Sequence, residues 1–165
     1  MTATTSVGLL LVAADDERVV AIFIEEGRTA NITLGKLRRR FPKSKFSDNH
    51  VRPLLSAVVQ FIETPKANLL LPMEIRGTSF QQKVWREVLK IPFGQTTSFA
   101  VIAKQIGVPK AVRAVGNACS QNPLEFAIPC HRVLRSNGSW SGGSVWGDFR
   151  QSTLVAREAE ANGSQ

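Results

Sequence analysis

Tyrosine is missing from this 165-residue sequence, and cysteine and histidine occur only twice each. The two cysteines, Cys119 and Cys130, are too few for the disulfide framework of a small secreted domain. The longest apolar run, Val7 to Ala14, is far shorter than the roughly 20 residues of a membrane-spanning helix. The N-terminus also lacks the basic flank of a secretory signal. Membrane proteins, disulfide-rich secreted domains and fibres are therefore excluded, and a cytoplasmic location is expected.

The composition that remains is that of a basic globular protein. Apolar residues make up 43% of the chain, which is enough to bury a core. The net charge of +8 favours an anionic partner, above all nucleic acid. Between Thr97 and Arg135, five basic residues accompany a single acidic one, Glu125. A second basic run, Lys36 to Arg40, is typical of the solvated face of a surface helix.

The first third of the chain has the pattern of a small sheet followed by helices. Two stretches are rich in β-branched residues and are separated by a polar turn. After them come two stretches with helical periodicity, the first of which stops before Pro42. The expected elements are strands Val7–Val12 and Val19–Ile24 and helices Thr33–Phe41 and Val51–Ile62.

A boundary between two units is expected near Arg76. A length of 165 residues fits one compact unit or two small ones, since a domain usually has about 100–200 residues. The stretch Leu69 to Met73 is interpreted as either an edge strand or a link between the units. The sequence therefore predicts an N-terminal unit over residues 1–75 and a C-terminal unit over residues 76–165.

The second unit is expected to be mainly helical. Thr78 and Gln81 have capping-box spacing, which predicts a helix start at this point. A further helix is expected from Ser98 to Ile106, with Gly107 as its C-terminal cap, and another from Pro109 to about Ser120. Two short helices joined by Gly107–Pro109 fit either a DNA-binding helix-turn-helix or an ordinary helical hairpin.

The run Ile128 to Val133 carries the strongest sign of chemistry. Cys130 can act as a nucleophile only as a thiolate, and His131 can accept its proton directly or through water. The positive charge of Arg132 is expected to favour the thiolate. The alternative is that Cys130 is a small buried apolar residue and that His131 has only a structural role.

Several further stretches surround this run and strengthen a resemblance. Together with Ile128–Val133, the stretches below resemble the O6-alkylguanine-DNA alkyltransferases, most of all the C-terminal alkyltransferase half of bacterial Ada proteins. The likeness is dense from Arg76 to Glu160 and thin before that. The stretches are Arg76–Trp85, Pro109–Val115, Gln121–Pro123, Ser141–Gly142, Trp146–Gly147 and Ala156–Glu160.

The resemblance implies a single-turnover repair reaction on duplex DNA. The alkylated guanine is flipped out of the helix, and Cys130 takes the alkyl group and is not regenerated. The resemblance makes His131 the base acting through a water, Glu158 the carboxylate that orients it, and Asn122 the brace of the turn beside the nucleophile. Arg113 is the arginine finger that holds the gap in the DNA.

The resemblance also assigns a DNA surface and a substrate pocket. No cofactor is expected, and no metal either, because two cysteines and two histidines, two of them at the acceptor site, are too few for a Cys/His zinc site. The expected partner is DNA containing O6-alkylguanine, with O4-alkylthymine as a second candidate, and a monomer is expected. The remaining DNA-binding residues are Ser98, Phe99, Lys110, Ala111 and Ala114, and the pocket residues are Val133, Trp140, Ser141, Ser144 and Val145.

Three positions depart from the family pattern. Phe99 and Ser144 replace two tyrosines, and the loss of the first removes a hydroxyl that donates toward the guanine. Gln151 replaces a lysine linked to the helix beside the pocket. The departures bear on rate and substrate range, and they leave Cys130 in place.

The resemblance implies an α/β fold with two parts. The first is a small N-terminal ribonuclease H-like α/β domain, and the second is a mainly helical alkyltransferase domain with a winged helix-turn-helix. Two other hypotheses stay open from the residues. One is a non-catalytic protein of the alkyltransferase-like type that binds alkylguanine DNA and senses damage. The other is a basic helix-turn-helix module with no preference for damaged DNA.

Overall fold

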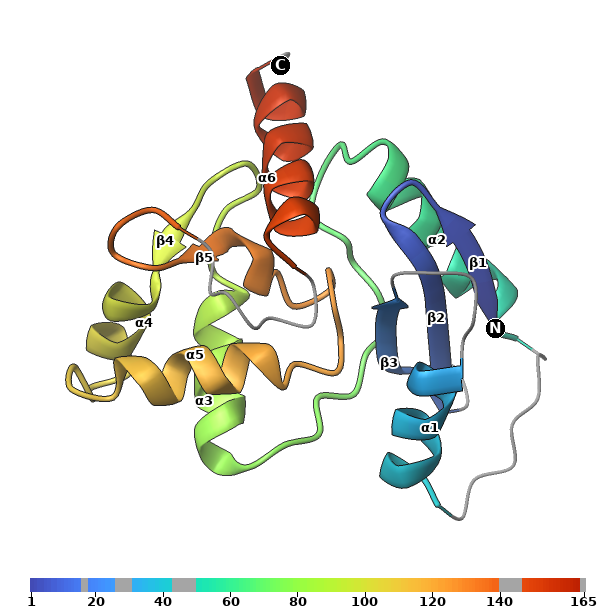
Figure 1. Ribbon diagram of the computed structural model, residues 1–165, viewed down its shortest axis with the longest axis horizontal. Helices are drawn as coiled ribbons and strands as arrows, with labels where there is room; N and C mark the ends of the chain where they lie inside the picture. The colour runs from blue at the N-terminus through green and yellow to red at the C-terminus, as the bar shows by residue number, and fades with distance from the viewer. Residues whose placement is uncertain (16–17, 26–30, 43–49, 140–146, 164–165) are drawn as a thin grey trace.

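The computed structural model describes residues 1–15, 18–25, 31–42, 50–139 and 147–163. A three-stranded sheet with two helices lies at one side of the molecule, and most of the other helices lie at the opposite side (Figure 1). The expected α/β class, with a small sheet and a mostly helical part, is confirmed. The sheet side contains β1 (Thr2–Thr5), β2 (Gly8–Asp15), β3 (Arg18–Glu25), α1 (Asn31–Arg40) and α2 (Arg52–Glu63). The remaining elements are α3 (Ser79–Val88), β4 (Thr97–Ser98), α4 (Phe99–Gln105), α5 (Val112–Ser120), the 3₁₀ helix η1 (Cys130–Arg132), β5 (Val133–Leu134) and α6 (Gly147–Gly163).

The sheet is antiparallel, and β2 lies between β1 and β3. Leu10 and Val12 belong to the large core that includes the buried face of α2. Leu11 and Ala13 belong to a smaller cluster with Leu37 of α1. Because successive side chains of a strand point to opposite faces, α2 and α1 cover the two faces of the sheet.

The two predicted strands and the two predicted N-terminal helices are confirmed, with ends that differ by a few residues. Strand β1 was not predicted. Its sequence contains three threonines and its burial alternates between exposed and intermediate, so it lacks the apolar pattern of a core strand. It forms by pairing with β2 at the edge of the sheet, which needs few buried side chains.

The stretch Leu69 to Met73 is a link with one bridge to the sheet rather than a regular edge strand. The backbone N–H of Val19 donates to the carbonyl of Pro72 at 2.7 Å, and the N–H of Glu74 donates to the carbonyl of Val19 at 3.0 Å. The link therefore runs against β3 before the chain enters α3.

The helical side confirms the predicted caps. Thr78 and Gln81 form the capping box of α3, with the Gln81 N–H donating to the Thr78 hydroxyl at 3.2 Å. The Ser98 hydroxyl also caps α4 by accepting from the Val101 N–H, a cap that was not predicted. Gly107 follows α4 with a φ of 81°, a conformation that favours glycine.

The prediction that the next helix begins at Pro109 is wrong. Helix α5 begins at Val112, and Pro109 lies in the turn before it. The Ala111 N–H donates to the Val108 carbonyl at 2.8 Å, which makes Pro109 the second residue of a tight turn. The fixed φ of proline suits that position as well as it suits a first helical turn, so the spacing could not separate the two.

The segment that leads into η1 runs along the edge of β3. The Ile22 N–H donates to the Pro123 carbonyl at 2.7 Å, and the Glu125 N–H donates to the Ile22 carbonyl at 3.3 Å. The buried Glu125 carboxylate also accepts from the Ile24 N–H at 3.1 Å. The N-terminal sheet therefore holds the backbone that positions the Cys130 region.

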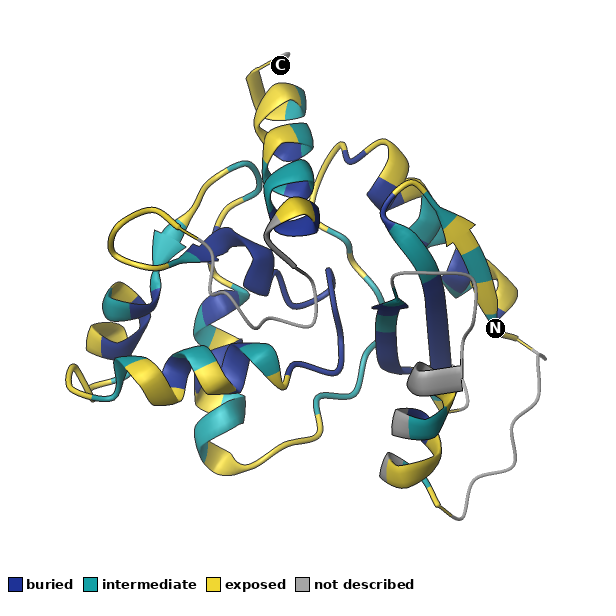
Figure 2. Ribbon diagram, viewed as in Figure 1, coloured by how far each residue is buried: buried dark blue, intermediate teal, exposed yellow. Residues whose placement is uncertain are grey.

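Burial follows this arrangement (Figure 2). Buried residues concentrate in β2, β3 and the segment that leads to η1, whereas α4 and α5 expose much of their outer surface. One large cluster of buried apolar residues joins the sheet, α2, α3 and the η1 region. Across the part of the chain that the structure describes, no helix combines the length and the apolar character that crossing a membrane requires.

Candidate active site

Cys130, His131 and Arg132 form the short helix η1, directly after Pro129. All three are buried: Cys130 is 6% exposed, His131 is inaccessible and Arg132 is 1% exposed. The fixed φ of Pro129 and the hydrogen bond from the Cys130 N–H to the Ile128 carbonyl, at 2.8 Å, define the entry to the turn. Three polar side chains in a closed turn must find partners inside the protein, because burying them unpaired is costly.

His131 finds its partner on α6. Its Nε2 lies 2.7 Å from Oε1 of Glu158, which is itself 1% exposed. The two residues are 27 positions apart, and α6 packs against η1 and brings them together. Burial lowers the pKa of His131, and the hydrogen bond and charge of Glu158 raise it without reversing the shift. The imidazole is therefore neutral near neutral pH and able to accept a proton.

Arg132 also binds Glu158, which differs from the expectation that it would act on Cys130. Its Nε donates to Oε2 of Glu158 at 2.7 Å and its Nη2 donates to Oε1 at 3.0 Å. Its Nη1 donates to Asn68 Oδ1 at 2.8 Å and to the Ile91 carbonyl at 3.0 Å. The guanidinium is therefore directed at the carboxylate and not at the thiol.

The resting Cys130 side chain is a neutral thiol. A hydrogen bond with the Cys119 thiol and burial raise its pKa well above the ordinary value, and Glu125 adds to the rise. Only Asn122, whose Nδ2 lies 3.5 Å from Sγ, acts in the opposite direction. The expectation of a thiolate favoured by Arg132 is therefore wrong for the protein without DNA, and the thiol needs a base before it can attack.

Asn122 braces the turn before the cysteine. Its Nδ2 donates to the Ile128 carbonyl at 3.0 Å, and its Oδ1 accepts from the Leu124 N–H at 2.9 Å. The same Nδ2 reaches Cys130 Sγ. These contacts tie Asn122 to the backbone on both sides of the turn.

Cys119 is a site residue that the sequence reasoning missed. It lies near the end of α5, is 6% exposed and raises the pKa of the Cys130 thiol. The available signal was weak: Cys119 lies near the end of the predicted helix and three positions before Asn122. A buried cysteine in a helix is common enough that the spacing alone does not single it out.

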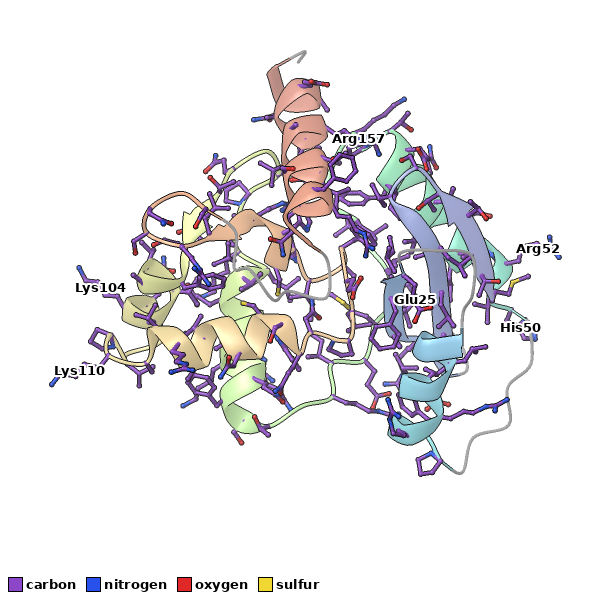
Figure 3. The ribbon with its side chains drawn as sticks, in the orientation of Figure 1. Glu25, His50, Arg52, Lys104, Lys110 and Arg157 are labelled. Atoms are coloured by element: carbon purple, nitrogen blue, oxygen red, sulfur yellow. The ribbon has the colours of Figure 1, made fainter. Side chains whose placement is uncertain are left out.

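The residues expected to contact DNA lie around α4 and α5. Ser98 pairs with Leu134 and Thr97 pairs with Val133, which places the start of α4 beside the strand that follows Cys130. Phe99 is 6% exposed, so its ring is part of the core. Lys110, Arg113 and Ala114 are exposed and Ala111 is partly exposed. Figure 3 shows Lys104 and Lys110 projecting from the end of this helical group that lies farthest from the sheet.

The predicted pocket is described only in part. Val133 is buried beside η1, and Gln151 is buried in α6. Trp140, Ser141, Ser144 and Val145 lie outside the described residues. Within the described ranges, no group of three or more His, Cys, Asp or Glu side chains is arranged to hold a metal ion.

A cavity of about 330 Å³ lies behind the site, between the link and the segment before Cys130. Its lining includes Asn68, Met73, Phe126, Pro129 and Arg132 but not Cys130. Because Cys130 does not line it, this cavity does not present a substrate to the thiol.

Comparisons with known proteins identify relatives of this chain. The family described as "6-O-methylguanine DNA methyltransferase, DNA binding domain" matches residues 79–160. The chain is 40% identical over 164 residues to the bifunctional transcriptional activator/DNA repair enzyme Ada of Escherichia coli, covering 96% of this chain and 44% of that protein. The crystal structure of Mycobacterium tuberculosis OGT in complex with DNA superposes with a TM-score of 0.76 at 27% identity, covering 97% of this chain and 92% of that one.

A further relative is covered over most of its length. The constitutive methylated-DNA–protein-cysteine methyltransferase of Bacillus subtilis is 33% identical over 147 residues, which cover 86% of this chain and 83% of that protein. The chain spans less than half of Ada, so the likeness to Ada concerns one part of that protein. Sequence identity of 33% over 83% of the Bacillus subtilis protein shows that this chain belongs to the methylated-DNA–protein-cysteine methyltransferase family.

Proposed function

We propose that this chain repairs O6-alkylguanine in duplex DNA by moving the alkyl group irreversibly to Cys130. The observation that carries the proposal is the buried set of Cys130, His131 and Glu158, in which a thiol lies next to a neutral base that a carboxylate holds. Nucleophile, base and orienting group are the three parts that activated-nucleophile chemistry needs.

The reaction begins with proton transfer. Glu158 binds Nε2 of His131, so the proton of the Cys130 thiol goes through a water molecule to Nδ1. The sulfur then attacks the alkyl carbon, the S–C bond forms, and the bond from that carbon to O6 breaks. The electron pair of the broken bond goes to the guanine, which recovers the proton at N1. The products are guanine and S-alkyl-Cys130.

Access to the buried thiol requires the damaged base to leave the DNA stack. Flipping costs a few kcal/mol and is easiest for a damaged base. Arg113, exposed on α5, would fill the gap, and Lys110, Ser98, Ala111 and Ala114 would contact the backbone around it. In support, the Mycobacterium tuberculosis OGT structure contains DNA and has the same fold.

The finer architecture belongs to the same proposal. Residues 1–75 form a ribonuclease H-like unit that supports the site, and residues 76–165 form the alkyltransferase unit. In the second unit α4 and α5 are the helix-turn-helix, with β4 and β5 at the position of its wing. The protein acts as a cytoplasmic monomer.

Phe99 sets an expected limit on the rate. The ring is buried next to the strand that follows Cys130, but it has no hydroxyl to donate toward the leaving guanine. A missing donor at a site of developing charge slows the step without changing its course. Transfer by this chain should therefore be slower than transfer by a variant with tyrosine at position 99.

The test is a transfer assay with a duplex that carries one O6-methylguanine labelled with ¹⁴C in its methyl group. The expected result is label moving from DNA to protein up to one equivalent, with no turnover beyond it. Cys130→Ala should bind the duplex and receive no label, whereas Cys119→Ala should still be labelled. Tight binding to the modified duplex without transfer would instead support an alkyltransferase-like sensor. Equal affinity for modified and unmodified duplex would support a plain helix-turn-helix module.

A further inference from the structure

Arg132 is a buried charge that the proposed mechanism does not use. It is 1% exposed, and a charge so placed is costly unless hydrogen bonds and an opposite charge compensate it. Four of its N–H groups have partners in Glu158, Asn68 and Ile91, and its guanidinium lies 5.6 Å from the centre of the Phe93 ring. So complete a set of contacts beside His131 suggests that Arg132 has a function in the site.

The contacts divide the Glu158 carboxylate between two partners. Oε1 lies 2.7 Å from His131 Nε2 and 3.0 Å from Arg132 Nη2, and Oε2 accepts from Arg132 Nε at 2.7 Å. The Gly94 N–H adds a long contact of 3.4 Å to Oε2. The two-pronged grip of Arg132 fixes the plane of the carboxylate, which in turn fixes the orientation of the imidazole.

Charge is the second consequence of this geometry. Among the described residues, the charged groups that act on His131 are Glu158 of α6 and Arg132 of η1. A buried carboxylate alone would favour the imidazolium, which cannot accept a proton. Arg132 offsets that negative charge, and its own positive charge opposes protonation of His131.

We propose that Arg132 is a positioning residue of the transfer reaction, which holds and neutralises Glu158 so that His131 stays neutral until Cys130 gives up its proton. The inference rests on the proposed function, because a neutral base matters only if the thiol must be deprotonated. It reverses the expectation from sequence, in which Arg132 acted on the thiol itself.

Asn68 takes part in the same arrangement. It lies on the link between α2 and α3, outside residues 79–160 that match the family, and its Oδ1 accepts from Arg132 Nη1 at 2.8 Å. Through Arg132, this contact connects the link to the orienting carboxylate of Glu158. Because Asn68 is exposed, it can be changed without emptying the core.

The experiment uses the two histidines of the chain. Protein labelled with ¹⁵N-histidine gives signals from the buried His131 and the exposed His50, and His131→Gln assigns them. The variants are Arg132→Gln, Arg132→Lys and Asn68→Asp, with Asn137→Asp as a matched control that adds the same charge at an exposed turn. The measurement needs no DNA and no alkyl transfer.

In Arg132→Gln the pH of half-protonation of His131 should rise by about one pH unit, and the single-turnover rate at pH 7 should fall about tenfold. In Asn68→Asp the pH of half-protonation of His131 should also rise, and the single-turnover rate should fall about threefold. Arg132→Lys should recover part of the change, because it keeps the charge without the two-pronged grip.

The proposal is overturned if His131 titrates in Asn68→Asp and in Arg132→Gln as it does in Asn137→Asp. Should Arg132→Gln fail to fold, the surface change Asn68→Asp decides the matter alone. Absence of transfer in the unmodified protein would instead overturn the proposed function. The titration of His131 needs no transfer, so the two failures can be told apart.

Discussion

The buried turn at Cys130 and the exposed surface of α4 and α5 solve different problems. Around the turn, Cys130, His131, Arg132 and Glu158 are each at most 6% exposed, and hydrogen bonds join Cys130 to Asn122 and both His131 and Arg132 to Glu158. On α4 and α5, Lys104 and Arg113 are exposed to solvent. The buried turn holds its charges in a fixed arrangement, whereas α4 and α5 expose theirs to solvent, where a binding partner can reach them.

The difference indicates how recognition and chemistry are divided. Buried, hydrogen-bonded groups are in position before DNA binds, so they cost little reorganisation during the reaction. Exposed charges contribute little individually and lose strength as salt is added. Changes in the turn should therefore alter the chemical step, and changes on α5 should alter access to it.

The largest expected effect is at the acceptor. Cys130→Ala removes the nucleophile and should abolish transfer, while affinity for O6-methylguanine duplex should stay within about threefold, because the DNA surface is unchanged. Single-turnover transfer and fluorescence anisotropy on one oligonucleotide measure the two quantities. Residual transfer in this variant would show that the turn does not hold the only acceptor.

The orienting carboxylate comes next. Glu158→Gln keeps the shape but loses the charge that holds His131 and Arg132, so the single-turnover rate should fall about a hundredfold. Glu160→Gln, an exposed change on the same helix, is the control and should leave the rate unchanged. Equal rates in the two variants would remove Glu158 from the account.

Acid should weaken the same buried contacts. Hydrogen bonds and charge from His131 and Arg132 outweigh burial and lower the pKa of Glu158 from 4.5 to about 2. The ionised carboxylate therefore stabilises the fold fully above about pH 4.5, and this contribution is lost as pH falls toward 2. It is on the order of 3 kcal/mol, and urea unfolding at pH 7 and pH 3 should show a smaller pH dependence in Glu158→Gln.

On the exposed side, Arg113→Ala should slow transfer from duplex DNA about thirtyfold, because nothing would hold the gap left by the flipped base. Transfer from the free base O6-methylguanine should be unaffected, since no flipping is needed. Lys104→Ala serves as the control for loss of one exposed charge. A parallel loss with the free base would place Arg113 in the chemistry rather than in access.

The smallest effect expected is a gain. Phe99→Tyr restores a hydroxyl at the start of α4 and should raise the single-turnover rate about tenfold. Phe149→Tyr adds the same group at a residue that is 74% exposed and should have no effect on the rate. A rate that is unchanged or lower in Phe99→Tyr would mean that the hydroxyl has no acceptor at this position.

The same division explains what could be predicted from the sequence. Local signals identified β2, β3, α2 and the caps at Thr78 and Gly107, because apolar periodicity and capping residues act within a few residues. Strand β1 was not predicted, because a polar strand that pairs at the edge of the sheet has no apolar pattern. The start of α5 was wrongly predicted at Pro109, because proline suits both a tight turn and a first helical turn.

The site was predictable in its residues and not in its contacts. Cys130 and His131 stood out by motif, and Glu158 and Asn122 by family resemblance. The partner of Arg132 depends on how α6 and the link pack against η1, 26 and 64 positions away in the sequence. Cys119 carries no motif, and its effect on the pKa of Cys130 depends on tertiary structure.

The most direct test of the central claim is where the alkyl group ends up. After reaction with duplex containing O6-methylguanine, mass spectrometry of the protein and its peptides should show a gain of about 14 Da. The added mass should be confined to Cys130 in the peptide that contains it. A methyl group on the neighbouring Cys119, or no added mass while the DNA is bound, would contradict the account.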